Sequence, residues 1–325
     1  MGNIWTLYFA PEIRGIKTVD TEYDFIVNPK ASSGMGEMIW KMLEPELKKR
    51  RVVYRVHMTR KRGHAAEIAK ALTLDGSEHT VVVLGGDGTV NETVNGICFP
   101  EKVTLGYIPT GSGNDFARGL GLPKEPLEAL GIILRREKTI HMDIGVLLGK
   151  KSRRFLVSAG MGFDAAVCHE VCVSHLKVLL NKIGLGKLSY AAVALDRLIK
   201  GRPVRLALTL TDGETKVFEK TYFAAFMNLP YEGGGFKFTP KASPEDGLLD
   251  VVVVHGLSLP KVVFLLLLAS GGKHVGFKGV SVLRCTGLKA EAETALPLHT
   301  DGEPGFLRKE IMASVLGEKL NVIVG

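Results

Sequence analysis

Residues 81–96, VVVLGGDGTVNETVNG, restrict the fold of this chain more than any other stretch. Their apolar start is typical of a strand buried in a sheet, and helical spacing follows directly after the glycines. The glycines leave Asp87 as the one large side chain in the connecting turn. Such a turn lets an anion reach the backbone N–H groups at the start of a helix, with no Cβ in the way. The stretch therefore predicts an α/β sheet with a phosphate-binding turn at its edge.

Strand and helix patterns alternate through the first part of the chain. Apolar runs predict strands at 23–27, 52–56, 80–84 and 104–108. Helical spacing predicts helices at 36–50, 64–72 and 89–95. Short strands that alternate with helices are joined by right-handed crossovers, which makes the sheet parallel. We expect residues 1–142 to form a nucleotide-binding α/β domain with this parallel sheet.

Strand patterns dominate the rest of the chain. Apolar runs predict strands at 154–159, 204–211, 221–228, 248–254, 280–285, 312–316 and 320–324. Asp212 and Gly213 separate two strand-like runs and are typical of a hairpin turn. Helical inserts are expected near 163–200 and 257–270. We therefore expect residues 143–325 to form a mostly antiparallel β-sandwich domain, with packing of the C-terminal tail back onto the first domain as the alternative.

Three glycine-rich turns follow the strands of the first domain. They are residues 28–36 (NPKASSGMG), 85–89 (GGDGT) and 109–115 (PTGSGND), and a helix is expected after each of them. Ligands collect at the carboxyl ends of the strands in open α/β sheets, so these turns predict a nucleotide site. The turns contain neither the GxxxxGK[ST] loop nor the dinucleotide fingerprint GxGxxG. The nucleotide site is therefore of another kind.

Acidic residues in three turns carry the remaining chemistry. A carboxylate beside phosphates is typically a magnesium ligand or a proton acceptor, although Asp87 in a plain turn would bond its own backbone. Residues 243–250 (SPEDGLLD) and 300–304 (TDGEP) each place carboxylates on a tight turn. Asp301 and Glu303 alternate along an extended segment, so both can point the same way. An ordinary hairpin turn is the alternative for TDGEP.

Five motifs in a fixed order resemble the diacylglycerol kinase catalytic superfamily. They are GGDGTVNETVNG, PTGSGNDFAR, GMGFDA, GGGFKFTPKASPEDGLLD and DGEP, and they extend over nearly the whole chain. The chain looks most similar to the soluble bacterial lipid kinases, with sphingosine and ceramide kinases as more distant relatives. GGDGT is shared with NAD kinases and phosphofructokinases, whereas PTGSGNDFAR and the late DGE are much more specific to lipid kinases.

The resemblance implies an ATP-dependent lipid kinase with ATP and Mg²⁺ as cofactors. Asp301 matches the proposed general base of the family, with Glu303 beside it and Asp87 at the phosphates. The implied nucleotide-binding residues are Asn28, Pro29, Lys30, Gly86, Asp87, Gly88, Thr89, Glu92, Thr110, Gly111, Ser112, Asn114 and Asp115. The implied ligands of a structural magnesium ion are the Asp246 carboxylate and the backbone carbonyls of Ser243 and Leu248.

One position departs from the family pattern. Many relatives carry a basic residue just after the first glycine turn, where this chain has Met35 and Glu37. Lys30 is the residue that we expect to replace this charge at the phosphates.

The formal net charge of +8 fits an anionic partner. A nucleotide, a nucleic acid and an acidic lipid surface all meet this requirement, and a solvated basic face is the alternative. The resemblance favours a lipid substrate at an anionic membrane surface, and no nucleic acid. We therefore expect a cytoplasmic protein that associates peripherally with membranes. A homodimer is one oligomeric state that the sequence leaves open.

No transmembrane segment is expected. Residues 1–10 lack the pattern of a signal peptide, and the longest apolar run, 262–269, is far shorter than the about 20 residues that span a bilayer. That run predicts a buried helix, with a shallow membrane contact as the alternative. Residues 173–187 mix apolar and basic side chains, and we expect them to dock on anionic lipid. The alternative is that they and residues 257–278 are core helices of the second domain.

Two other functions remain open at this point. A NAD kinase-like enzyme also uses GGDGT, and a catalytically silent lipid-binding regulator could share the fold. PTGSGNDFAR argues against the first, and the presence of Asp87, Asp301 and Glu303 argues against the second. Diacylglycerol, phosphatidylglycerol, a sphingoid base and a polyprenol each offer one hydroxyl on an apolar tail, so the sequence does not select the lipid.

Overall fold

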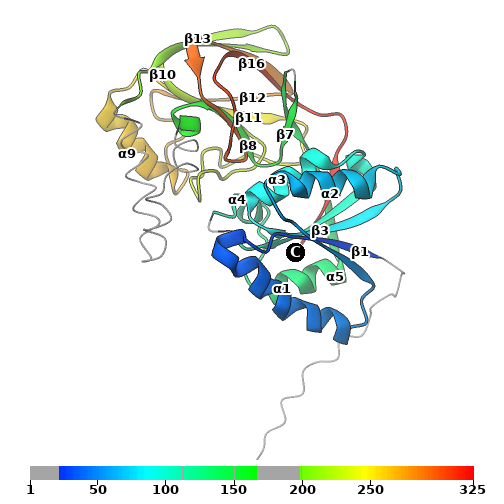
Figure 1. Ribbon diagram of the computed structural model, residues 1–325. Coiled ribbons are helices and arrows are strands. Elements are labelled where there is room, and N and C mark those ends of the chain that lie inside the picture. The colour runs from blue at the N-terminus through cyan, green and yellow to red at the C-terminus, as the bar shows by residue number, and fades with distance from the viewer. Residues whose placement is uncertain (1–21, 112, 150, 167–197, 199) are drawn as a thin grey trace, which may run out of the picture.

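The computed structural model describes residues 22–111, 113–149, 151–166, 198 and 200–325. These residues form an α/β region with a mostly parallel sheet, followed by a region built on an antiparallel sheet (Figure 1). The fold class predicted from the sequence is thereby confirmed.

The first sheet begins with four parallel strands. They are β1 (Tyr23–Val27), β2 (Tyr54–Met58), β3 (His79–Gly85) and β4 (Val103–Pro109), in the spatial order β2-β1-β3-β4. All four were predicted within two residues at either end, because each is an apolar run that ends at a turn. Their carboxyl ends lie at one edge of the sheet, where all three glycine-rich turns begin.

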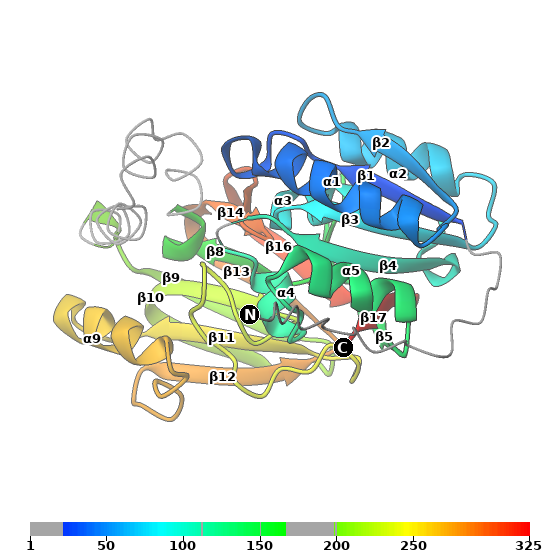
Figure 2. The same ribbon diagram turned by 90° about the horizontal axis from the view of Figure 1, so that it is seen from below.

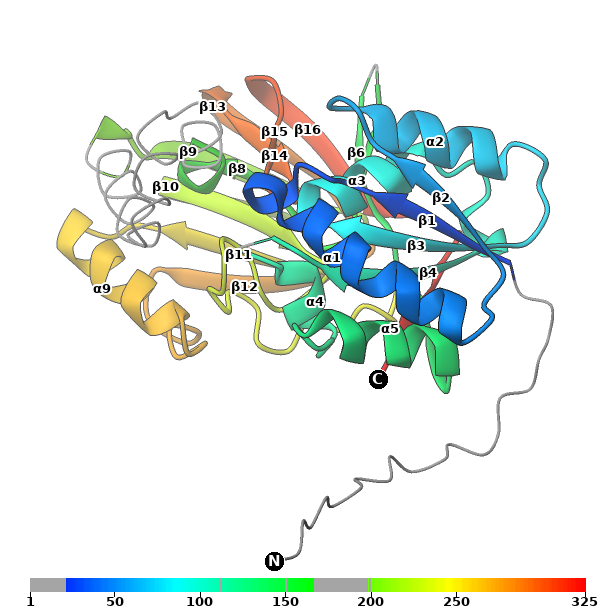
Figure 3. The same ribbon diagram turned by 60° about the horizontal axis from the view of Figure 1, so that its bottom comes forward.

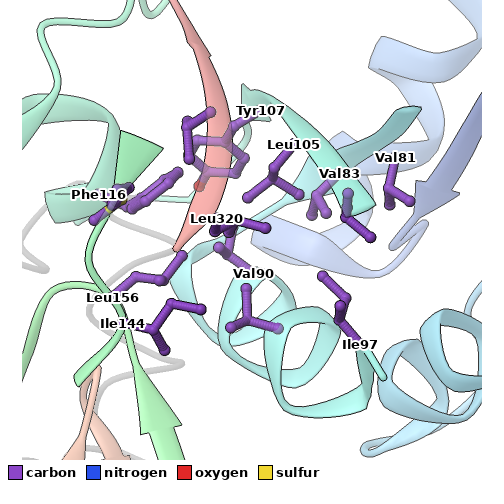
Figure 4. Close-up of a cluster of buried hydrophobic side chains, with 14 of the residues drawn as sticks. Val81, Val83, Val90, Ile97, Leu105, Tyr107, Phe116, Ile144, Leu156 and Leu320 are labelled. Carbon is purple, nitrogen blue, oxygen red and sulfur yellow. The ribbon is translucent and has the colours of Figure 1, made fainter. Parts of the chain in front are cut away.

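Helices cover both faces of this sheet. Apolar side chains of α1 (Ala31–Lys49) and α5 (Pro126–Arg135) pack on one face, and those of α2 (His64–Thr73) and α3 (Asp87–Gly96) pack on the other. The sheet therefore has one apolar core on each face. Alternate residues of β3 point into the two cores, with Val82 facing α1 and Val83 facing α3. The core on the side of α2 and α3 also includes Ile144 and Leu156, which lie beyond the first sheet (Figure 4). The two regions therefore share buried apolar contacts.

The last strand of the chain returns to the first sheet. β17 (Leu320–Val324) pairs in parallel with β4 and antiparallel with β5 (Lys138–Met142), as Figure 2 shows. β17 therefore belongs to the first sheet, not to the second. A short 3₁₀ helix, η1 (Pro100–Lys102), precedes β4, and the short helix α4 (Asp115–Gly119) follows it.

The second sheet is antiparallel and contains most of the remaining strands. Its main path runs in the order β15-β14-β8-β10-β9-β13-β16-β6-β7, and β11 and β12 continue from β10. The bounds are β6 (Gly145–Leu148), β7 (Arg153–Phe155), β8 (Ser158–Gly162), β9 (Val204–Leu210), β10 (Thr215–Met227), β11 (Leu249–His255), β12 (Val280–Cys285), β13 (Gly287–Leu296), β14 (Leu298–Thr300), β15 (Glu303–Pro304) and β16 (Arg308–Val315). The hairpin predicted at Asp212 and Gly213 joins β9 to β10, and Gly213 has a φ of 89°.

Two expectations for this region need correction. The strand predicted at 154–159 is divided into β7 and β8, because the backbone N–H groups between them bind a side chain rather than a strand. The apolar run predicted as a buried helix lies in α9 (Leu259–Ala269), which is only partly buried. Val262, Leu265 and Ala269 face the core, whereas Phe264 and Leu267 are exposed.

Most of the insert predicted at 163–200 lies outside the described residues, and so does the whole of segment 173–187. Among the described residues, no helix combines the length and the apolar character that a bilayer crossing requires.

The position of β17 leads to a stability prediction. Leu320 is fully buried in the core between the first sheet and α3, so Leu320→Ala should lower the free energy of unfolding by about 2–5 kcal/mol. Glu318→Ala is the matched control, because Glu318 is exposed in the same segment. Urea denaturation measures both variants. Equal stability of Leu320→Ala and wild type would show that the C-terminal strand contributes little to the first domain.

Candidate active site

The three glycine-rich turns lie side by side at the carboxyl edge of the first sheet. The backbone N–H of Asn28 donates to Leu84 O at 2.9 Å, and that of Thr110 donates to Gly85 O at 2.8 Å. The Asn28 side-chain amide donates to Thr89 Oγ1 at 3.1 Å, which joins the first turn to the second. The parallel pairing of the strands therefore brings the three turns to one edge of the sheet, as the sequence predicts.

Glycine is required where the turns meet. A Cβ on Gly36 would overlap the backbone carbonyl of Asn28, so the start of α1 can approach β1 only with glycine there. A Cβ on Gly111 would lie 3.1 Å from Gly86 Cα. The first turn also passes through left-handed conformations at 32–34, so the regular part of α1 begins after Gly34. The backbones of the turns therefore approach one another closely, which suits an anion site built from backbone N–H groups.

Asp87 holds the third turn against the second. Its carboxylate accepts hydrogen bonds from the backbone N–H groups of Asp115 and Phe116, at 3.1 and 3.3 Å, at the start of α4. Burial, together with the nearby carboxylate of Asp115, raises the pKa of Asp87 to about 7. A plain turn residue would bond its own backbone, whereas Asp87 bonds another turn.

Asp115 links this edge to the second sheet region. Its carboxylate pairs with Arg118 Nη1 at 2.6 Å and accepts a hydrogen bond from the backbone N–H of Gly234 at 2.7 Å. Gly234 lies in a glycine run between β10 and β11. Burial raises the pKa of Asp115, although the Gly234 and Arg118 contacts oppose that rise. Two acids with raised pKa values, Asp87 and Asp115, therefore lie together where the second and third glycine-rich turns meet.

Asp301 is held by four hydrogen-bond donors. Its Oδ2 accepts from the Asn91 side chain at 2.8 Å and from the backbone N–H of Leu156 at 3.0 Å. Its Oδ1 accepts from the backbone N–H groups of Val157 and Ser158 at 2.8 and 3.1 Å. Burial raises the pKa of Asp301, and these four bonds oppose the rise. Because a carboxylate offers about four acceptor positions, all of them are occupied.

Glu303 lies against the GGDGT turn. A Cβ added to Gly88 would be 2.6 Å from Glu303 Oε1, so the two turns touch at this point. Glu303 Oε2 forms an ion pair with Arg62, which follows β2. Arg62 was not predicted as a site residue. The signal for it was a run of basic residues, 60–62, directly after a strand that ends at the same sheet edge.

Two asparagines of the opening motif connect the two regions, which the sequence did not reveal. The side-chain amides of Asn91 and Asn95 both donate to the carbonyl of Arg154, at 3.1 and 3.0 Å. The backbone N–H of Arg154 donates in return to Asn95 Oδ1 at 2.9 Å. The helix after GGDGT therefore fixes the position of β7, and with it the backbone groups that hold Asp301.

A buried acid–histidine cluster lies next to the turn that carries Asp301. His299 Nε2 lies 3.1 Å from Asp164 Oδ2 and 3.0 Å from Glu232 Oε1, and its Nδ1 accepts from the backbone N–H of Gly302 at 3.3 Å. A Cβ on Gly160 would overlap this cluster. Asp164 belongs to the motif GMGFDA, but no sequence pattern indicated a role for any of these three side chains. Their positions connect the Asp301 turn to the loop that carries Gly234.

The remaining residues that the sequence predicts to bind nucleotide make different contacts. The backbone N–H of Lys30 donates to Asn28 Oδ1 at 3.2 Å, and its side chain is exposed. Thr110 Oγ1 and Asn114 Oδ1 are buried without a hydrogen-bond partner among the described residues. Glu92 instead accepts from the backbone N–H groups of Gly63 and Ala65, so its carboxylate caps α2. Pro29 follows Asn28 in the first turn, and Ser112 lies outside the described residues.

A groove of about 630 Å³ opens beside the third turn. One wall belongs to α1, and the other to the third turn and the start of α5. Its lining residues are Met35, Met38, Ile39, Met42, Pro109, Thr110, Gly111, Asn114, Lys124, Glu125 and Pro126. Its volume lies in the range typical of small-molecule sites. Met35, which departs from the family pattern, is therefore part of a groove wall.

The predicted magnesium turn makes other contacts. Asp246 Oδ1 accepts from the backbone N–H of Leu248 at 3.1 Å, and Oδ2 pairs with Arg284. The adjacent backbone N–H of Gly247 donates to Asp143 Oδ2 at 2.7 Å. Ser243 lies in the same turn, before Pro244, whose carbonyl accepts from the backbone N–H of Asp143. Carboxylate and carbonyl oxygens are suitable magnesium ligands. However, the Asp246 carboxylate already forms an ion pair with Arg284, which neutralises its charge.

Comparisons with known proteins agree with this architecture. Residues 22–147 match the family model of the diacylglycerol kinase catalytic domain, and residues 157–324 match that of the YegS C-terminal NAD kinase beta sandwich-like domain. The candidate lipid kinase YtlR of Bacillus subtilis strain 168 is 33% identical over 285 residues, covering 86% of this chain and 92% of its own. A diacylglycerol kinase of the same strain is 30% identical over 77% of this chain and 78% of its own.

Solved structures show the same fold. A diacylglycerol kinase structure from Bacillus anthracis strain Sterne matches with a TM-score of 0.73 and 23% identity, over 94% of this chain and 97% of the other. An NAD kinase from Archaeoglobus fulgidus in complex with ATP matches with a TM-score of 0.54 and 12% identity, over 93% of both chains.

The fold and the family matches together define a protein of the lipid kinase class. The chain belongs to the diacylglycerol kinase catalytic family, with a YegS-type C-terminal domain. The family resemblance inferred from the five motifs is confirmed.

The raised pKa of Asp87 leads to a prediction of pH dependence. A raised pKa stabilises the folded state below the ordinary carboxyl range, and this contribution is lost as the pH rises through about 7. Between pH 5 and 7.5, the free energy of unfolding of wild type should therefore fall more steeply than that of Asp87→Asn. The difference in slope should reach about 1.4 kcal/mol per pH unit at most.

Urea denaturation without Mg²⁺ or nucleotide measures this difference. Asp115 and Asp301 also have raised pKa values and are present in both proteins, so the difference reports Asp87 together with its electrostatic interaction with these neighbours. Parallel pH profiles of the two proteins would show that Asp87 titrates in its ordinary range.

Proposed function

We propose that this protein is an ATP-dependent lipid kinase that transfers the γ-phosphate of ATP to a hydroxyl of a membrane lipid. The observation that carries the proposal is the meeting of the GGDGT and DGE turns, where Glu303 Oε1 occupies the space beside Gly88. This contact brings the acidic turn of the second region to the phosphate-binding edge of the first. Family membership supports the same reaction class.

The triphosphate would lie along the glycine turns. Backbone N–H groups of these turns and of the start of α3 neutralise phosphate charge without side chains. Asp87 and Asp115 are the carboxylates that would hold Mg²⁺, which supplies charge neutralisation of the phosphates when it is bound. Their raised pKa values fit this role, because a buried acid pair without a cation is favoured in a protonated form. Lys30 is the exposed cation of the first turn.

The groove beside the third turn is suited to the adenine base. Met35, Met38 and Met42 offer flexible, polarisable thioethers to a flat aromatic ring. Thr110 Oγ1 and Asn114 Oδ1, which lack a partner among the described residues, are acceptors for the sugar or base. A base placed here directs the phosphates toward the GGDGT turn.

In the proposed reaction, the lipid hydroxyl oxygen bonds to the γ-phosphorus while the bond to the leaving ADP oxygen breaks. The hydroxyl proton passes to Asp301. Because Asp301 already accepts four hydrogen bonds, one donor must leave first. The Asn91 amide is the side-chain donor from the first region, so a small shift between the regions would release it. The Glu303 carboxylate, paired with Arg62, would lie beside the transferred phosphate.

The acceptor lipid stays in its bilayer, because transfer of an acyl chain into water costs about 0.8 kcal/mol per methylene. The enzyme must therefore work at the membrane surface, and its net charge of +8 favours an anionic one. Radiolabel transfer from ATP into a total lipid extract identifies the acceptor. Parallel reactions with purified diacylglycerol, phosphatidylglycerol, a sphingoid base, a polyprenol and NAD separate a lipid kinase from a NAD kinase-like enzyme.

Replacement of the proposed base tests the chemistry. Asp301→Asn should reduce the rate of transfer by about 10²-fold to 10⁴-fold, because asparagine cannot accept the hydroxyl proton. ATP binding, measured by calorimetry, should remain. Asparagine also turns an amide toward backbone donors, so thermal unfolding of the variant must be measured as well.

Asn91→Ala is the matched control for the structural role of Asp301. It removes one of the four donors while leaving the carboxylate, so its rate should remain well above that of Asp301→Asn. A fully active Asp301→Asn variant would remove Asp301 from the mechanism. Equal loss of rate and of stability in both variants would assign Asp301 a structural role alone.

The proposed magnesium turn can be tested by stability. Mg²⁺ should raise the melting temperature of wild type relative to EDTA, and Asp246→Ala should reduce that rise, because metal binding is coupled to folding and only the proposed site at Asp87 and Asp115 remains in the variant. Arg284→Gln is the control, since it removes the competing ion pair and should leave the Mg²⁺ effect or increase it. A wild-type melting temperature that is equal in Mg²⁺ and EDTA would leave the Arg284 pair as the sole role of Asp246.

A further inference from the structure

The outer face of α9 and the segment directly after it in the sequence expose large apolar side chains. The exposed fractions are 54% for Phe264, 70% for Leu267, 42% for Val275 and 46% for Phe277. Single exposed apolar residues are normal on soluble proteins, whereas a group of large ones marks an interaction surface. We refer to these four residues as the α9 face.

The α9 face is not needed for the core. The opposite side of the helix already packs on the second sheet through Val262, Leu265 and Ala269. Phe264 and Leu267 lie three residues apart and point the other way, so α9 is apolar on both sides. Large apolar side chains on the exposed side of a helix mark a surface that contacts a membrane or another protein. α9 is not fully buried.

Basic residues accompany the α9 face along the sequence. Lys261, Lys273 and Lys278 are exposed within or beside it. The sequence contains no Asp or Glu from residue 251 to residue 290. An apolar surface with lysines around it and no acid in its own segment complements a surface that is anionic outside and apolar beneath. A bilayer with anionic headgroups has this arrangement, since lysine stems extend over apolar groups while their amines reach the phosphates.

The placement of α9 leaves this face accessible. Figures 1 and 3 show α9 on the outside of the second sheet, away from the helices of the first. With 11 residues, α9 is too short to cross a bilayer and suits a position in the plane of the interface.

We propose that the α9 face is the membrane-docking surface of this protein, with Phe264, Leu267, Val275 and Phe277 entering the interface of an anionic bilayer and Lys261, Lys273 and Lys278 contacting lipid phosphates. This inference rests on the proposed function, because a lipid acceptor requires contact with a membrane. It identifies a docking surface among the described residues, outside the predicted segment 173–187.

The experiment compares full-length variants by co-sedimentation with vesicles of phosphatidylcholine and phosphatidylglycerol, in the absence of ATP. Phe264→Gln/Leu267→Gln tests the apolar part, and Lys261→Gln/Lys273→Gln/Lys278→Gln tests the basic part. Val217→Gln/Met312→Gln is the matched control, because both residues are exposed apolar side chains that lie outside the α9 face, on β10 and β16. All substitutions are at exposed positions, and melting temperatures verify folding.

We expect each α9 variant to bind vesicles about tenfold or more weakly than wild type, and the control to bind like wild type. The loss in the lysine variant should shrink at high salt. Activity toward a short-chain lipid dissolved in detergent should stay near wild type, since no substituted residue belongs to the candidate active site.

Vesicle binding by the α9 variants that equals that of the control would overturn the proposal. So would a change from dimer to monomer with unchanged vesicle binding, since the face would then contact a second copy. Because vesicle binding is measured without turnover, its outcome is separate from that of the kinase reaction. A wild-type protein that binds vesicles through α9 but phosphorylates no lipid would refute the proposed function and retain the docking surface.

Discussion

The carboxylate of Asp301 holds the two regions of this protein together at the site. It accepts one hydrogen bond from Asn91 of α3 and three from the backbone between β7 and β8. Asn91 and Asn95 in turn bind the carbonyl of Arg154, so α3 fixes the same backbone from the other side. The helix that begins with the phosphate-binding turn is therefore the one that positions the proposed base. A movement of α3 at the GGDGT turn would therefore change the hydrogen bonds that hold the Asp301 carboxylate.

The site concentrates negative charge that the protein itself neutralises only in part. Burial raises the pKa values of Asp87, Asp115 and Asp301, and Arg118 and Arg62 each pair with a single carboxylate at this edge. This charge is consistent with the proposed binding of Mg²⁺ and a nucleotide at this edge. The α9 face has the opposite character, with lysines and apolar side chains and no acid in its segment. The separation suits an enzyme that binds a nucleotide at one place and a lipid surface at another.

Local patterns predicted much of the fold. The strands and helices around the three glycine turns were found because buried parallel strands are apolar runs and their helices keep a regular spacing. β13, β14 and α5 were missed, although all three contribute to the cores. The apolar run 262–269 was expected to be buried, because composition does not distinguish a helix covered on both sides from one covered on a single side.

The fold class, the family and the three glycine turns with their acids could be predicted from the sequence, because they depend on residues that are neighbours along the chain. The three-dimensional arrangement was needed to see that Glu303 touches Gly88, that Glu92 caps α2, and that Arg62 and the His299 cluster flank the acidic turn. It was also needed to see that Asp301 is enclosed by four donors and that Phe264 and Leu267 face outward. These facts depend on contacts between residues far apart in the chain, and periodicity along a sequence carries no information about such distances.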